Sequence, residues 1–240
     1  MTNYRLIRTG LASAILAGGA ALAVPTIASA SVQHSKQHDF SSNQKALEAQ
    51  LAIRVSQLSR LGTDVTGAKT LTTAHAATLT ASITTTTANI NALVVRVPTD
   101  TTNAQVNADR TAMIRQNRVF AVLTPQVFQT IEADAIGAEV TSLQAEEPGL
   151  LSAVNALVGE HGYTNARNHY TAFVTLVNDA SLNSTNVAAR VLAQAPRNFP
   201  HDTDVFVRAN KELLNADIAL AHANYDASVI GLASGGYTGA

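Results

Sequence analysis

The sequence predicts an all-α fold, an elongated antiparallel bundle of the coiled-coil type. Three observations support this prediction. Apolar residues recur every seven residues, in steps of three and four, over several segments of the chain. No segment keeps the strict alternation of a half-buried strand. Charged residues make up only 14% and aromatic residues 5% of the 240 residues, and tryptophan is absent, so Ala, Val, Leu and Ile must build the core.

The first 30 residues have the parts of a secretory signal peptide in the expected order. Arg5 and Arg8 form a basic start, the apolar stretch 11–24 follows, and Ala28-Ser29-Ala30 is a small-x-small cleavage site. The alternative is an N-terminal membrane anchor, but the apolar stretch is shorter than the ~20 residues that span a bilayer. We therefore expect a cleaved signal over 1–30 and no stable membrane span afterwards. The mature protein would be secreted, extracellular or associated with the cell wall.

The charge of the mature chain excludes some partners. Without Arg5 and Arg8, 14 basic and 17 acidic residues remain, which gives a net charge near −3. Such a chain lacks the basic surface that nucleic acid requires and the basic face of a membrane-surface helix. The sequence contains no cysteine, so a lipoprotein anchor and a disulfide scaffold are both excluded.

The remaining chain divides into a polar lead-in expected to be disordered (31–41), a helical bundle (42–232) and a flexible tail (233–240). The strongest heptad pattern runs through 203–232, where Phe206, Leu213 and Leu220 are spaced by seven. The run Ile83 to Ala88, "ITTTTA", has high β propensity, but it stays in phase with Leu79 and Ile90 and is predicted to be helical. The predicted helices are 42–61, 73–97, 102–145, 149–159, 163–194 and 203–232, with turns near 62–72, 98–101, 147–149, 159–163 and 195–202.

Pro125 lies in the middle of the predicted central helix, 102–145. Two apolar stripes keep the seven-residue step across it: Val106, Met113, Phe120 and Val127, and beside them Ile114, Ala121, Phe128 and Ala135. In one interpretation, Thr124 caps a new helix with Pro125 at its first position. In the other, which the unbroken phase favours, one long helix is kinked at Pro125 and the Ala121 carbonyl loses its partner. In the kinked helix the Thr124 hydroxyl could bond to the Phe120 carbonyl.

Three stretches resemble a known group of proteins: "LTTAHAATLTASI" (71–83), "RVFAVLTPQVF" (118–128) and the heptad helix after "NFPHDT". The chain is similar, over most of 45–232, to exported Ala/Thr-rich all-helical proteins of high-GC Gram-positive (actinobacterial) bacteria. This resemblance implies export and an all-helical fold, but it carries no activity and no catalytic residues. Members often have histidine where this chain has Phe128, which argues against a ligand at this position.

The sequence predicts no catalytic residue, no cofactor and no metal site. His34 and His38, with Asp39 beside them, have i, i+4 spacing but lie in the lead-in, and zinc sites need three or four convergent ligands. His161 and His169 are expected to be solvated surface residues. The sequence contains none of the nucleophile motifs GxSxG and SxxK, and no glycine-rich phosphate loop.

Carboxylates gather towards the end of the central helix: Glu132, Asp134, Glu139, Glu146 and Glu147. Glu132 and Glu139 share a face and could do acid–base chemistry if their environments separated their pKa values. A solvated helix face is the expected reading. Asp134 lies in an apolar stripe, so it either marks where the stripe meets solvent or pairs with an arginine such as Arg167 or Arg190.

The sequence favours an exported structural or interaction protein of the cell envelope or extracellular space, without catalytic activity. Its partners would be an envelope protein or a second copy, held through helix faces. The alternative is a carrier of an apolar small molecule between helices near Pro125. The threonines between Thr70 and Thr87 are possible sites of O-linked sugar. The expected pocket of the carrier is lined by Phe120, Leu123, Val127, Phe128 and Ile131.

Overall fold

The computed structural model describes residues 40–200 and 203–235, which lie in one compact unit comprising 39–240. These residues contain helices and turns and no strand, which confirms the all-α prediction for the described part of the chain. Five helices are long: α2 (Phe40–Gly67), α3 (Thr73–Arg96), α5 (Thr124–Asn155), α6 (Tyr163–Ser184) and α8 (Thr203–Ala233). The shorter elements are η2 (Val97–Thr99), α4 (Asn103–Thr111), η3 (Ala112–Gln116), η4 (Val119–Leu123), α7 (Val187–Leu192) and η5 (Pro196–Asn198).

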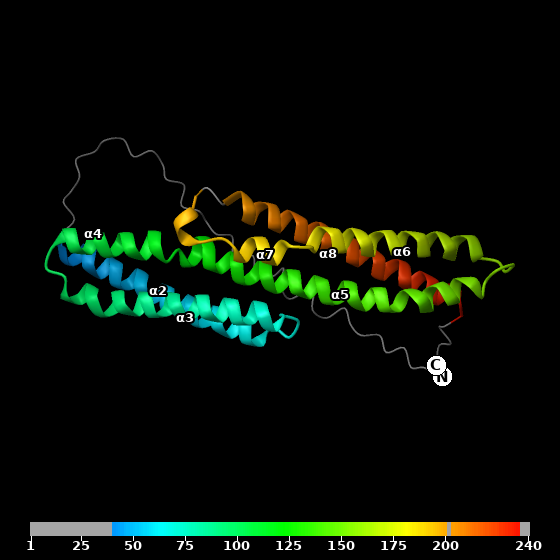
Figure 1. Cartoon of the computed structure of the whole chain (residues 1–240), viewed down its shortest axis with the longest axis horizontal. Helices are drawn as coiled ribbons and strands as arrows, with labels where there is room; N and C mark the ends of the chain where they lie inside the picture. The colour runs from blue at the N-terminus through cyan, green and yellow to red at the C-terminus, as the bar shows by residue number, and fades with distance from the viewer. Residues whose placement is uncertain (1–39, 201–202, 236–240) are drawn as a thin grey trace. The chain divides into compact units, whose positions relative to one another are not determined.

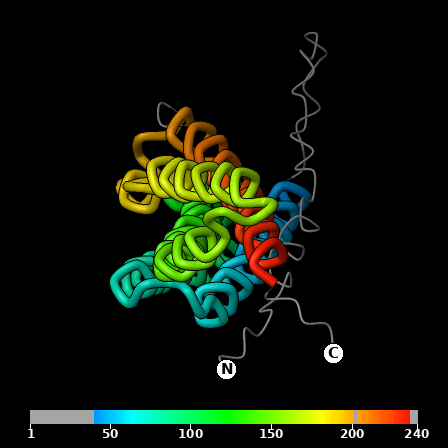
Figure 2. Tube along the Cα trace, turned by 90° about the vertical axis from the view of Figure 1, so that its right-hand side faces the viewer, coloured from blue at the N-terminus to red at the C-terminus, as the bar shows by residue number. Residues whose placement is uncertain are grey.

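Helix α5 lies between two groups of helices (Figures 1 and 2). On one side, α2 and α3 pack against each other and against α4, η4 and the start of α5. On the other side, α6 runs back along α5 and packs along α8, which runs in the same direction as α5 (Figure 1). The first group buries a core that includes Leu51, Ile90 and Val127. The second buries a core that includes Phe173 and Leu213.

The heptad pattern predicted in 203–232 is the buried face of α8. Phe206, Leu213 and Leu220 are at most 8% exposed, and the small residues between them are buried too: Ala209, Ala216 and Ala223. The run "ITTTTA" is helical, as predicted, because Ile83 and Ile90 reach the first core only at helical spacing. Burial of an apolar face therefore overrides the β propensity of threonine.

Several predicted boundaries are wrong. Helix α2 begins at Phe40, inside the expected lead-in, and continues to Gly67 because Val65 is still buried. The turn predicted at 147–149 and the separate helix at 149–159 do not exist, since Pro148 lies inside α5. The predicted helix 163–194 ends at Ser184, where the hydroxyls of Ser184 and Thr185 bond back to α6 and Asn186 turns left-handed with φ 63°.

The predicted single helix over 102–145 is also interrupted, at Asn117 and Arg118 rather than at Pro125. Arg118 has φ 35°, a left-handed conformation that is rare for a residue with a side chain. The π-helical segments η3 and η4 flank it. Pro125 lies in the first turn of α5, as in the interpretation in which a new helix begins at this proline. The Thr124 hydroxyl donates to the carbonyl of Val119 at 2.9 Å, and not to that of Phe120.

This interruption changes which residues of the two stripes are buried. A π-helical turn holds an extra residue, so it shifts the apolar phase of everything that follows. Val106, Met113 and Val127 are fully buried as predicted, but Val119 takes the core position and Phe120 is 38% exposed. Ile114 and Phe128, from the second stripe, are 42% and 39% exposed.

The second core predicts a clear contrast between two residues of α6. Phe173→Ala removes a fully buried ring and should lower the free energy of unfolding by ~3–5 kcal/mol. Leu182→Ala is the matched control, because Leu182 is 75% exposed on the same helix and its loss should change stability by less than about 0.5 kcal/mol. Urea unfolding followed by circular dichroism measures both, and equal losses would contradict this packing.

Candidate functional site

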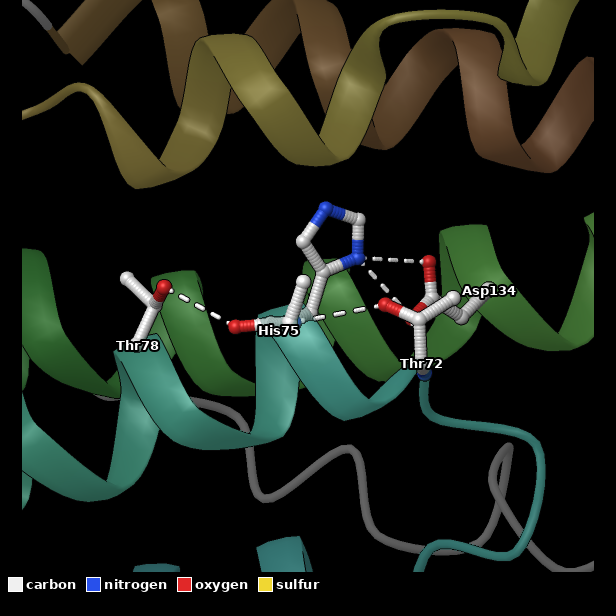
Figure 3. Close-up of polar contacts among 5 residues, drawn as sticks. Thr72, His75, Thr78 and Asp134 are labelled. Carbon is white, nitrogen blue, oxygen red and sulfur yellow. Dashed lines mark hydrogen bonds and ion pairs between the residues drawn. The ribbon is translucent and has the colours of Figure 1, made fainter.

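Asp134 joins α5 to the start of α3 (Figure 3). Both of its carboxylate oxygens lie 2.9 Å from Nδ1 of His75, and one accepts the backbone N–H of Thr72 at 2.7 Å. The Thr72 hydroxyl in turn accepts the backbone N–H of His75 and caps α3. The Asp134 side chain is only 8% exposed, so these bonds satisfy a carboxylate held largely away from water.

The prediction that Asp134 pairs with Arg167 or Arg190 is wrong. Arg190 pairs with Glu212 of α8, and the Arg167 guanidinium lies over the ring of Tyr170. The sequence contained a partial signal for the true partner. A polar residue in an apolar stripe needs a partner, and His75 stands three residues after the N-capping Thr72, where its ring can face a neighbouring helix.

The His75–Asp134 pair lacks the third group that a hydrolytic triad needs. Nε2 of His75 points away from Asp134 (Figure 3), and no hydroxyl of the described residues is bonded to it. The nearby Thr78 hydroxyl donates instead to the carbonyl of Ala74 at 3.0 Å. The geometry therefore supports a contact between helices, in which Asp134 fixes the start of α3 against α5.

A second His–Asp contact joins α6 to α8. Nδ1 of His169 lies 2.6 Å from Oδ1 of Asp226, and the two side chains are 25% and 10% exposed. The edge of the Tyr225 ring meets His169 with the centroids 6.2 Å apart. The prediction that His169 is solvated is therefore wrong, because the heptad face of α8 contains a buried aspartate that needs a partner. His161 is exposed in the turn before α6, as predicted.

The carboxylates of α5 form a small cluster with α8. Glu132 and Asp217 are close enough to share a hydrogen bond, and Glu139 lies near Asp217. Partial burial, reinforced by Asp217, raises the pKa of Glu132 to about 7. Burial and Glu139 also raise the pKa of Asp217, whereas the bond from Glu132 lowers it. The raised pKa favours the protonated form of Glu132 at mildly acid pH, in which its hydroxyl can donate a hydrogen bond to Asp217.

The expectation of a plain solvated face is wrong for Glu132. It holds for Glu139, which is exposed and whose Oε1 accepts the side-chain amide of Asn224 at 2.8 Å. Sequence reasoning could not find Asp217, because α8 is brought beside α5 only by the fold. Among the described residues no group of three or more His, Asp or Glu side chains is arranged to hold a metal ion.

The interruption at Asn117–Arg118 is fixed by contacts with the loop before α8. The Arg118 guanidinium donates to the carbonyl of Pro196 at 2.9 Å and lies 4.3 Å from the centre of the Phe199 ring. Beside it is an open cleft of about 370 Å³, lined by Arg115, Gln116, Ala195, Pro196 and Arg197. Another cleft, of about 480 Å³, is a depression on the outer face of α6 from Asn168 to Leu176.

The residues predicted to line an apolar pocket line neither of these clefts. Leu123 and Val127 are buried in the first core, and Ile131 packs against it. The guanidinium of Arg54 lies over the ring of Phe120, with Cζ 5.2 Å from the ring centre. Phe128 is partly exposed. The structure does not place the five in one cluster, and the apolar pocket stays a prediction.

Helix α8 has a second apolar face, which is exposed. Val207, Leu214, Ile218, Tyr225 and Leu232 are between 50% and 69% exposed. With Ala221, also exposed, they are spaced by seven, four, three, four and seven residues. At ~100° per residue they fall on one line, opposite the face that packs on α6 and α5. An aligned set of large exposed apolar residues is typical of an interaction surface.

Two earlier expectations fall partly outside the described residues or outside what the geometry tests. His34, His38 and Asp39 precede Phe40 and lie outside the described ranges. Glycosylation between Thr70 and Thr87 stays a prediction.

Comparison of the chain with protein-family models, curated proteins and solved structures found no match. Each helix in the described ranges is too short or too polar to cross a membrane.

Breaking the α3–α5 contact should destabilise the fold. Asp134→Ala leaves the Thr72 N–H and the His75 ring without their acceptor, so the free energy of unfolding should fall by about 2 kcal/mol. A double-mutant cycle with His75→Ala should give a coupling above about 0.5 kcal/mol. Thr78→Ala is the control, since it removes only an exposed bond within α3. Additive losses would show that His75 and Asp134 do not interact.

The Glu132–Asp217 pair predicts a pH dependence of stability with a defined sign. The pKa of Glu132 rises from 4.5 to about 7 on folding. Between these values the folded state holds a proton that the unfolded state has lost, so the free energy of unfolding falls as pH rises through this window. Below pH 4.5 this contribution is constant.

Glu132→Gln mimics the protonated acid and should remove that part of the slope. At pH 8 the variant should be more stable than the parent by about 1 kcal/mol, a value reduced because both side chains are partly exposed to water. Glu146→Gln is the matched control, an exposed carboxylate on the same helix. Denaturation between pH 4 and pH 8 measures the difference from the parent, and parallel profiles for Glu132→Gln and the parent would contradict a proton on Glu132.

Proposed function

We propose that the protein is an exported structural or interaction protein of the cell envelope or extracellular space, without catalytic activity. The observation that carries this proposal is the exposed apolar face of α8, because a helix with an exposed apolar line presents a surface for another helix. The signal-like order of residues 1–30 supports export. The His75–Asp134 and His169–Asp226 pairs connect helices and have no bonded nucleophile in the described part of the chain, which is consistent with a role in structure.

We also propose a coiled-coil-like packing of an elongated bundle, with a bend at Pro125. The seven-residue spacing of the buried residues of α8 supports the packing. Pro125 supports the bend, since its missing N–H leaves a carbonyl of the preceding π-helical turn without a helical partner.

The proposed function predicts where the protein is found and what retains it there. When the full chain is expressed in a high-GC Gram-positive host, the protein should be recovered outside the cytoplasm without residues 1–30. Intact mass spectrometry of the recovered protein measures this removal. Leu214→Glu combined with Ile218→Glu should lower the fraction retained on the cell envelope at least ~3-fold, because two charges interrupt the apolar face.

The matched control is Thr171→Glu combined with Thr175→Glu. These residues are also exposed, lie four apart on α6 and gain the same charge, but they lie outside the α8 face. Circular dichroism confirms that both variants fold. An unprocessed chain confined to the cytoplasm would contradict the proposed function.

A further inference from the structure

We propose that the exposed apolar face of α8 pairs with the same face of a second copy of the chain, with the two α8 helices antiparallel. This inference rests on the proposed interaction function and names its partner. The face consists of Val207, Leu214, Ile218, Ala221, Tyr225 and Leu232, and all six are exposed in the described chain.

The spacing of the face is that of a coiled-coil seam. Steps of three and four residues keep a line of side chains facing a partner helix over several turns, whereas other spacings drift around the helix. From Val207 to Leu232 the face extends ~37 Å, at 1.5 Å per residue. A globular ligand or a loop would cover only part of such a narrow line, but another long helix covers all of it.

The face is complementary to itself when the two helices run in opposite directions. Alignment about a two-fold axis between Ile218 and Ala221 brings Val207 opposite Leu232, Leu214 opposite Tyr225, and Ile218 opposite Ala221. Large residues then meet large ones at the ends, and at the centre isoleucine meets alanine, which lets the helices approach. Each layer occurs twice, as an interface between identical copies requires.

The charges on the seam favour this direction over the parallel one. Lys211 and Ser228, both exposed, occupy the remaining seam positions. In a parallel, in-register pair Lys211 would face Lys211, and two like charges would be brought together in a partly desolvated layer. In the antiparallel pair Lys211 faces Ser228. At the flanks, Asp217 comes opposite Asn224 and Asn215 opposite His222, so no acidic residue of one α8 faces an acidic residue of the other.

The area is sufficient for a weak, specific dimer. The large apolar side chains of the face are 50% to 69% exposed, and burying them in both copies removes on the order of 1,000 Å² from water, near the lower limit for a specific interface. Flanking side chains add to this value. The dimer is therefore expected to form reversibly rather than as an obligate unit.

The absence of cysteine makes the test direct. Leu214→Cys and Tyr225→Cys are purified separately as full-length exported chains, then mixed and oxidised under mild conditions. In the antiparallel pair residue 214 of one copy faces residue 225 of the other, whereas the two copies of residue 214 lie ~16 Å apart along the axis, beyond the reach of a disulfide. The mixture should therefore give the 214–225 disulfide, and each variant alone should stay uncrosslinked.

Sedimentation equilibrium of the cysteine-free chain gives the affinity. Leu214→Glu combined with Ile218→Glu should weaken dimerisation about 100-fold, because it places charges in adjacent layers. Thr171→Glu with Thr175→Glu should leave it unchanged.

Several results would overturn the dimer. Disulfides within each variant alone would show a parallel or random encounter, and a monomer at all concentrations without the 214–225 disulfide would show that no pair forms. A monomer whose envelope retention still depends on Leu214 and Ile218 would leave the proposed function standing and assign the face to another protein. A cytoplasmic, unprocessed chain that nevertheless forms the 214–225 disulfide would overturn the proposed function and leave the dimer standing.

Discussion

Helix α5 must satisfy two cores at once, and the rest of the structure depends on this constraint. Its start packs with α2 and α3, and its later turns pack with α6 and α8. A helix with neighbours on several sides buries polar positions as well as apolar ones. Gln126 donates to carbonyls at the end of α7 and just after it, Gln129 donates to the carbonyl of Phe206, and Asp134 holds the start of α3. These directional bonds set the positions of the other helices along α5, which apolar contacts alone would leave free to slide.

Helices whose environment is uniform along their length could be predicted from the sequence, together with their buried faces. The faces of α3 and α8 could be predicted because one side is buried and the period is regular, so that even "ITTTTA" could be assigned to a helix. The interruption at Asn117–Arg118 could not be predicted. Neither residue is glycine or proline, and the left-handed turn of Arg118 is held by the Pro196 carbonyl and the Phe199 ring, which are distant in sequence. Pro125 was the local signal for an interruption of the helix, but tertiary contacts place the interruption at Asn117 and Arg118 instead.

The candidate site shows the same division between local pattern and tertiary contact. The Glu132–Asp217 pair and both His–Asp contacts join residues that are far apart in the chain, and no local motif specifies them. The exposed line on α8 differs, because its spacing is visible in the sequence. In the sequence, the apolar residues of this exposed line cannot be told from those of the buried face of α8, because both sets are spaced by three, four and seven. Only the burial of each residue in the structure separates the two sets. A helix with apolar residues on both sides has a second surface on which another helix can pack.

The left-handed turn at Arg118 also affects how the molecule unfolds, because it separates the helices of the first core from α5. The first core is built largely from α2, α3 and α4, and the second from α6, α7 and α8; the two share α5 and η4, just after the interruption. Cooperativity requires that the loss of one region removes contacts from the other. Here such contacts are made mostly by α5 and η4, besides those of α3 with α7 and of η3 with η5. We therefore expect the α2–α3 pair to open more readily than the α6–α8 pair. Hydrogen exchange would then divide the amides into two groups with different opening free energies, even where urea unfolds the whole chain in one transition.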